Sequence, residues 1–155
     1  YRLTDNFMIS PGIRESYSLL TSSAIRDDWG HNHELLLAMN CNWKMGDWNF
    51  SDRNLFHFVH ASANQNIKNY TLYRNCIKAQ LPCCKLTSLQ LVPFISDELF
   101  FKESVGYFRN RAQIGVTAQL LEKVSMNLFY QWQTTETSTG WRTLNAFGLF
   151  FNGSF

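Results

Sequence analysis

The chain has 155 residues, of which 45% are hydrophobic and only 17% are charged. This length corresponds to one domain, 1–155, and the 13 Phe, 6 Tyr and 5 Trp residues exclude a disordered chain, because disordered chains contain few aromatic residues. The formal charge is +2 and the Lys and Arg residues are scattered, so nucleic acid is not an expected partner. The longest apolar runs, 35–39 and 146–151, are far shorter than the ~18 residues of a transmembrane helix.

Alternation of apolar and polar residues with a period of two recurs along the chain and predicts β-strands. Tyr1 to Phe7 is typical of a strand end, a turn at Asp5 and Asn6, and the start of the next strand. In the third predicted strand, Asp52 and Asn54 fall on the apolar side, which predicts a bulge or a strand end there. The eight predicted strands are 7–16, 34–43, 48–58, 73–81, 89–98, 109–120, 124–133 and 146–155.

The predicted connections alternate between short and long. The short ones are 44–47, 82–85 and 121–123, and the long ones are 19–32, 60–69, 99–107 and 134–142. Short periplasmic turns and longer outer loops are typical of outer-membrane barrels. We therefore expect an all-β, antiparallel transmembrane β-barrel of the outer-membrane type. Eight strands are visible, and we favour ten in the full protein, with the first strand and part of the second preceding Tyr1. The alternative is eight strands with residues 1–6 as a lead-in.

Alternation alone does not distinguish a membrane barrel from a soluble, lipocalin-like barrel, because the apolar face points outward in one and inward in the other. Long polar side chains in the middle of the strands favour a polar lumen and a lipid-facing apolar side. Large aromatic residues near the strand ends are expected to form an interfacial girdle, which comprises Trp43, Trp48, Tyr130 and Trp132.

The polar face collects charged residues, which predicts a charged lumen. In a barrel of about 8 to 10 strands the side chains fill the interior, so an ion-pair network centred on Glu98 with Arg109 and Arg111 is expected. A narrow pore or a small anion site is the alternative, because cations outnumber carboxylates. The predicted network comprises Arg14, Glu34, Arg53, His57, Arg74, Lys78, Glu98, Arg109 and Arg111.

The last strand has alternating apolar residues and a terminal Phe, and it resembles the carboxy-terminal insertion signal of bacterial outer-membrane barrels. Delivery to the barrel assembly machinery is what this resemblance implies for Phe147, Leu149, Phe151 and Phe155. The motifs SDELFF at 96–101, FRNR at 108–111 and YQWQ at 130–133, followed by the closing strand, resemble the barrel family known as domain of unknown function 2490. The resemblance covers residues 48–155, whereas residues 1–47 share only the strand pattern.

These patterns predict a small, non-catalytic barrel in the bacterial outer membrane that acts as a structural or accessory subunit of an envelope assembly. Its expected partners are outer-membrane lipid, the assembly machinery and another envelope protein, and no cofactor is expected. The alternatives are a transport or binding barrel with a cationic lumen and a lipid hydrolase that uses His57 or His60, although no G-x-S-x-G motif is present. Asp27, Asp28, His31 and His33 share one loop and contain metal-binding groups, but polar residues in a solvated loop more often serve only solubility, so no metal is expected. No role is assigned to Cys83 and Cys84.

Overall fold

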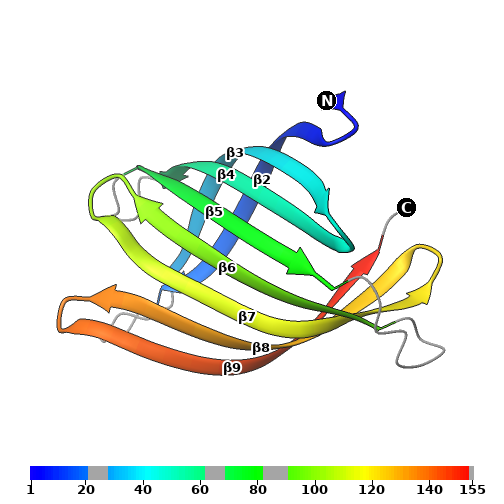
Figure 1. The fold of residues 1–155 in the computed structure, drawn as a ribbon. Coiled ribbons are helices and arrows are strands. Elements are labelled where there is room, and N and C mark those ends of the chain that lie inside the picture. Colours follow the sequence, from blue (N-terminus) through cyan, green and yellow to red (C-terminus); the bar gives the residue numbers. More distant parts are fainter. Residues whose placement is uncertain (21–27, 62–68, 82–90, 154–155) are drawn as a thin grey trace.

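The computed structural model describes residues 1–20, 28–61, 69–81 and 91–153, and gives only the backbone of 16–20, 28–32 and 61. Nine β-strands make up its regular structure (Figure 1). No helix in the described part of the chain has the length and hydropathy needed to cross a membrane. The strands are β1 (Arg2–Thr4), β2 (Phe7–Leu20), β3 (Asp28–Met45), β4 (Trp48–Ala61), β5 (Tyr70–Gln80), β6 (Val92–Lys102), β7 (Gly106–Leu121), β8 (Val124–Thr137) and β9 (Gly140–Gly153).

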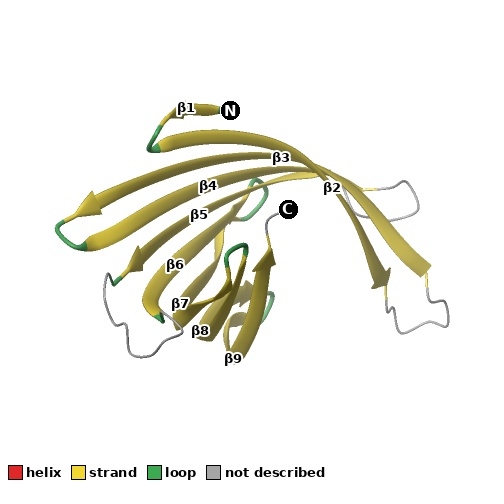
Figure 2. Ribbon diagram, turned by 90° about the vertical axis from the view of Figure 1, so that its right-hand side faces the viewer, coloured by secondary structure: helices red, strands yellow, loops and turns green. Residues whose placement is uncertain are grey.

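Each strand pairs antiparallel with the next one along the chain, which gives a single nine-stranded sheet in the order β1 to β9. The short strand β1 pairs only with the beginning of β2, at Met8 and Phe7. Among the described residues β9 pairs with β8 alone, so the sheet has two free edges. The sheet is strongly curved, with β2 to β4 arching over β6 to β9 (Figures 1 and 2). The all-β, antiparallel prediction is thus confirmed.

All eight predicted strands are present, and most extend further than predicted. The expected turn at Asp5 and Asn6, between the end of one strand and the start of the next, is also confirmed. The short connections at 44–47 and 121–123 are tight, as predicted.

The predicted alternation of short and long connections is wrong at two places. The connection between β6 and β7 is residues 103–105, and that between β8 and β9 is residues 138–139, where long loops were expected. The strands continue into these segments because Phe and Thr favour extended backbone. Gly140, with φ of 108°, adopts the left-handed conformation that lets the chain reverse in so few residues. The predicted short turn at 82–85 lies outside the described residues.

The predicted bulge or strand end at Asp52 and Asn54 is wrong. The registers of β4 with β3 and with β5 run through both residues without a shift. The described strand pairs have register shifts at other places. They lie in β1, between Phe100 and Phe101 of β6, and near Leu121 of β7. Asp52 and Asn54 are therefore polar residues within a regular strand, on the same face as its apolar side chains.

The two faces of the sheet differ in burial, and the polar face is the concave one. Glu34, His57 and Glu98 are all buried, and Glu98 is only 5% exposed. On the convex face the large apolar side chains are exposed, and they include Ile114 at 53% and Phe147 at 83%. Apolar burial on the concave side is limited to a few residues such as Phe94 and Phe100.

Phe129 is an apolar residue on the polar face, and glycines on both neighbouring strands make room for it. Gly115 and Gly148 are its partners in β7 and β9. A Cβ atom at Gly148 would overlap the ring of Phe129, and one at Gly115 would overlap the Leu128 carbonyl oxygen and lie 2.7 Å from Phe129 Cβ. An aromatic ring covering a strand glycine is a known way of fixing the register of a sheet.

We expect Gly115→Ala to lower the free energy of unfolding by about 1 to 3 kcal/mol, because the added methyl group meets backbone that has no free space to move into. Gly12→Ala is the matched control, since its Cβ would meet only Leu36 Cβ at 3.7 Å, an ordinary contact. Denaturant midpoints of the two variants measure the difference. Equal midpoints would show that the strands separate easily at Gly115.

Candidate functional site on the concave face

Glu98 lies at the centre of a cluster in which one carboxylate contacts three arginines. Its Oε1 accepts hydrogen bonds from Arg74 Nη2 at 2.6 Å and from Arg53 Nη2 at 3.3 Å, and its Oε2 accepts one from Arg111 Nη1 at 3.4 Å. Register explains the convergence. Arg53 pairs with Cys76, Cys76 with Glu98, and Glu98 with Arg111, so these side chains lie in one row across the concave face.

The predicted ion pair of Glu98 with Arg111 is present, whereas the one with Arg109 is not formed. Arg109 donates from Nε to Thr135 Oγ1 at 3.2 Å, and its guanidinium lies 5.4 Å from the ring centroid of Phe100. Arg74 and Arg111 also lie over Phe100, at 4.9 and 5.1 Å. The predicted strand ends at Glu98 and therefore leaves out Phe100. Continuing the alternation by two residues places this ring on the inward face.

Glu34 forms a second cluster on the same face. Arg14 donates to Glu34 Oε2 at 2.5 Å, and His57 Nδ1 lies 3.1 Å from the same oxygen. His57 is 1% exposed, and its Nε2 has no hydrogen-bond partner among the described residues. Arg14 pairs with Glu34 in the β2–β3 ladder, which brings their side chains together.

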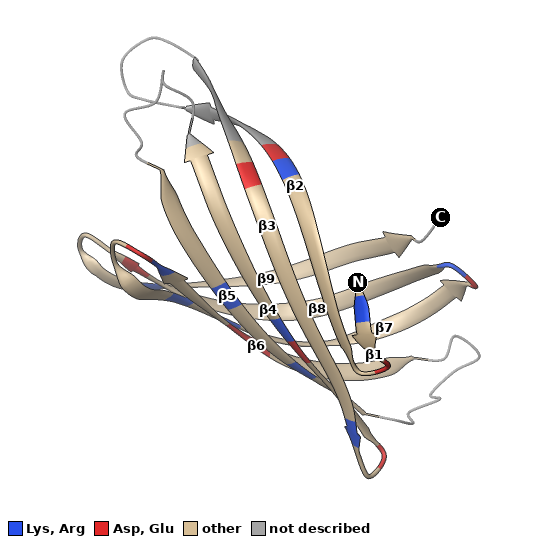
Figure 3. Ribbon diagram, turned by 90° about the horizontal axis from the view of Figure 1, so that it is seen from above, with Lys and Arg blue, Asp and Glu red and all other residues tan. Residues whose placement is uncertain are grey.

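A hollow of about 620 Å³ occupies the concave face, lined by residues from β2 to β9. Arg53, Arg74, Glu98 and Arg111 line it, together with Lys78, whose Nζ lies 4.2 Å from the ring centroid of Phe94. Charged positions of both signs lie along β4, β5 and β6, within the strands (Figure 3). Among the nine predicted network residues six are Lys or Arg and two are carboxylates, so the face carries an excess of positive charge.

The two histidines that a hydrolase would use lie on opposite faces, because His57 and His60 are three residues apart in one strand. His60 pairs across the strands with His33, whose Nδ1 lies 2.7 Å from Glu15 Oε1. No group of three His, Cys, Asp or Glu side chains in the described part of the chain is placed to hold a metal ion. The side chains of Asp27, Asp28, His31, Cys83 and Cys84 lie outside the described residues.

The four predicted girdle residues divide into two groups on the convex face. Trp43 and Trp48 flank the β3–β4 turn and stack on Phe50, with centroids 5.5 and 6.3 Å apart. Tyr130 and Trp132 are in the middle of β8 and contact each other edge to face at 4.7 Å. Tyr130 and Trp43 nevertheless belong to one row of paired residues across the sheet, which is Trp43, Phe50, Ala79, Ile95, Ile114, Tyr130 and Phe147.

The convex face has a longer aromatic row nearer the β6–β7 turn. This row was not predicted, because loops were expected at 99–107 and 134–142. In this row successive ring centroids are 4.9 to 5.9 Å apart. Its members, which we call the aromatic ladder, are Phe56, Tyr73, Phe101, Tyr107 and Trp141.

Three residues of the predicted insertion signal, Phe147, Leu149 and Phe151, lie exposed on the convex face of β9. Phe155 lies outside the described residues.

The family described as "Protein of unknown function (DUF2490)" matches residues 1–144 of the chain. The protein therefore belongs to the DUF2490 family, as the sequence motifs predicted. The match also includes residues 1–47, which the motifs had left out. No curated protein and no solved structure shows significant similarity to the chain.

Proposed function

We propose that the protein is a small, non-catalytic β-barrel of the bacterial outer membrane that serves as a structural or accessory subunit of an envelope assembly. The observation that carries this proposal is the inverted burial of the sheet. Buried Glu34, His57 and Glu98 line the concave face, while Ile, Leu and Phe side chains cover the exposed convex face. A water-soluble sheet buries its apolar face, whereas a membrane barrel turns that face to lipid.

The strand lengths support this proposal. Strands β2 to β9 have 11 to 18 residues, and a tilted strand needs about 9 to 11 to cross a bilayer. Lipid does not hydrogen-bond to backbone, so the free edges of β2 and β9 require pairing inside a membrane. Pairing of β9 with β2, directly or through further strands as in the ten-stranded arrangement, gives the backbone N–H and C=O groups of both edges hydrogen-bond partners.

The concave face supports a structural rather than a channel-forming role. The side chains of Arg53, Arg74 and Arg111 extend across it to Glu98, and Gln113 and Gln131 hydrogen-bond to each other at 2.9 Å beside them. Such networks fill the interior of barrels with few strands.

The test is membrane fractionation combined with heat modifiability on a denaturing gel. We expect the protein in the outer-membrane fraction, inserted by the barrel assembly machinery, and migrating faster unheated than boiled because the folded barrel resists the detergent. A periplasmic protein with one mobility would contradict the proposal. Depletion of the assembly machinery is the control, since it should abolish the fast-migrating form without changing the boiled one.

A second candidate function, anion binding or transport, is favoured by the excess of cations around the 620 Å³ hollow. Purified protein in a planar bilayer would then conduct with a preference for anions, and Lys78→Gln would reduce that preference because Lys78 lines the hollow. Absence of current in chloride and in phosphate would exclude transport.

A further inference from the structure

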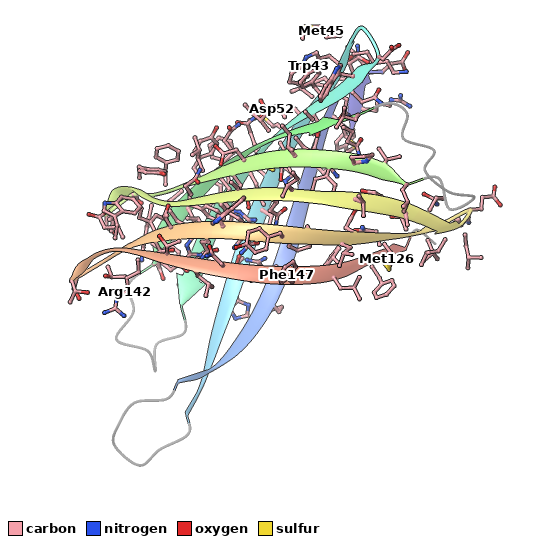
Figure 4. All side chains as sticks on the ribbon, turned by 60° about the horizontal axis from the view of Figure 1, so that its bottom comes forward. Trp43, Met45, Asp52, Met126, Arg142 and Phe147 are labelled. Atoms are coloured by element: carbon pink, nitrogen blue, oxygen red, sulfur yellow. The ribbon has the colours of Figure 1, made fainter. Side chains whose placement is uncertain are left out.

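A belt of polar side chains crosses the convex face between two mainly apolar rows. Its members occupy two adjacent rows of paired residues, which run from β4 to β9 without a break in register at these positions. Asp52 in β4 is one of them (Figure 4). We call this surface the outer polar belt, and it comprises Asp52, Asn54, Asn75, Asp97, Asn110, Thr134, Thr143 and Asn145.

The belt residues hydrogen-bond to one another. Asn75 Nδ2 donates to Asp52 Oδ1 at 2.6 Å and to Asn54 Oδ1 at 3.1 Å, and Asn54 Nδ2 donates to Asp52 Oδ2 at 3.0 Å. Asn110 Nδ2 donates to Asp97 Oδ1 at 2.6 Å. The carboxylates of Asp52 and Asp97 thus have amide donors, while no ion pair involving either of them forms among the described residues.

Apolar residues border the belt on both sides, so it is not the rim of the apolar face. The aromatic ladder lies on one side, and Tyr73 of this ladder donates from its hydroxyl group to Asn54 Oδ1 at 2.5 Å. The row that contains Ile95, Ile114 and Tyr130 lies on the other side. Asp52 and Asp97 flank Ile77, which is 50% exposed, so an isolated apolar side chain stands between two carboxylates.

Lipid is a poor cover for such a surface, because the amide donors leave the negative charges of Asp52 and Asp97 in place and a charge that faces hydrocarbon is costly. A second copy of the chain is also a poor cover. The belt and the two rows beside it contain Asp52, Asp97 and Glu136 and no Lys, Arg or His, so a symmetric contact would bring carboxylates against carboxylates. The negative charge of the belt is complementary to a partner surface that carries Lys or Arg.

We propose that the outer polar belt is the docking surface for a membrane-embedded segment of another envelope protein, and that this segment presents Lys or Arg to Asp52 and Asp97. The inference rests on the proposed function, because it takes the convex face to be embedded in the membrane. The aromatic ladder and the apolar row pack against the same segment on either side, while the belt determines which partner fits.

The test is photo-cross-linking in intact cells. A photoreactive residue replaces Ile77, inside the belt, or Leu128, which is equally exposed at 49% but lies in an apolar row. We expect Ile77 to yield a discrete cross-linked protein whose joined peptide contains Lys or Arg, and Leu128 to yield lipid adducts. The double variant D52N/D97N should reduce the Ile77 product at least tenfold. The control variant D5N/D47N removes two negative charges from turn residues and should leave the yield of the Ile77 product unchanged.

A charge exchange completes the test. D97K should abolish the cross-link from Ile77. Replacing the Lys or Arg of the cross-linked partner peptide by Glu should restore the cross-link to D97K. Lipid adducts alone, a cross-link to a second copy of the chain, or a cross-link whose yield D52N/D97N does not change would overturn the inference.

Heat modifiability, measured for the unsubstituted protein and for every variant, keeps this inference separate from the proposed function. If the unsubstituted protein has no fast-migrating form, the proposed membrane barrel itself is contradicted. If the double variant D52N/D97N does not insert into the membrane, the single variant D97N replaces it in the test. This variant is expected to insert, because Asp97 is exposed and accepts only one side-chain hydrogen bond among the described residues.

Discussion

Glu98→Ala is expected to lower the free energy of unfolding by about 3 to 5 kcal/mol, the cost of leaving buried charges without their partner. Three guanidinium groups converge on this one carboxylate, and the side chains of Arg74 and Arg111 are themselves largely covered. Removing Glu98 leaves like charges close together in a confined space, where water screens them poorly. Denaturant-induced unfolding of the protein from lipid vesicles measures the change.

Two variants control this prediction. Glu122→Ala removes an exposed carboxylate in the β7–β8 turn and should change the free energy by less than about 0.5 kcal/mol. Glu98→Ala combined with Arg111→Met should recover part of the loss, because it removes one of the unpaired cations. An unchanged midpoint for Glu98→Ala alone would mean that water reaches the cluster freely.

Ile114→Lys is expected to cost about 2 to 4 kcal/mol, because a charge in the middle of a lipid-facing strand is penalised by its depth in the bilayer. Ile114 is 53% exposed in the isolated chain, so the same substitution in a water-soluble sheet would change stability by less than about 0.5 kcal/mol. The two environments therefore predict different results for one variant.

The measurement is again unfolding from vesicles, with Ser138→Lys in the β8–β9 turn as the matched control. Both variants add one positive charge at an exposed position. A large cost for Ile114→Lys and none for Ser138→Lys would support burial of the convex face in lipid. Equal costs would place that face in water.

Much of the fold follows from the sequence because a period of two is a direct consequence of strand geometry. The alternation from Val124 to Trp132, for example, places its residues on the faces where the structure has them. Strand ends are harder to predict. Thr134–Thr137 and Phe100–Lys102 contain residues that favour extended backbone but lack a clear alternation of apolar and polar residues, so only pairing with the adjacent strand shows that the strands include them.

The members of the charge clusters were predictable, but of their pairings only that of Glu98 with Arg111 was predicted. Alternation places Arg53, Arg74 and Arg109 on one face without giving the register of β4 against β5 or of β6 against β7. The bulge between Phe100 and Phe101 lies immediately beside the pairing of Phe100 with Arg109. The prediction of a bulge or strand end at Asp52 and Asn54 was wrong for a related reason. Polar residues on an apolar face are typical of a strand end, and only the polar residues of the neighbouring strands show that these two belong to the outer polar belt.

The single carboxylate at the centre of the arginine cluster also bears on the order of assembly. Glu98 comes from β6, whereas its partners come from β4, β5 and β7. A sheet that grew one hairpin at a time in chain order would bring the cations of β4 and β5 together before their counter-ion. We therefore expect strands β4 to β7 to form as one cooperative unit, and a chain that ends after β5 to remain unable to insert.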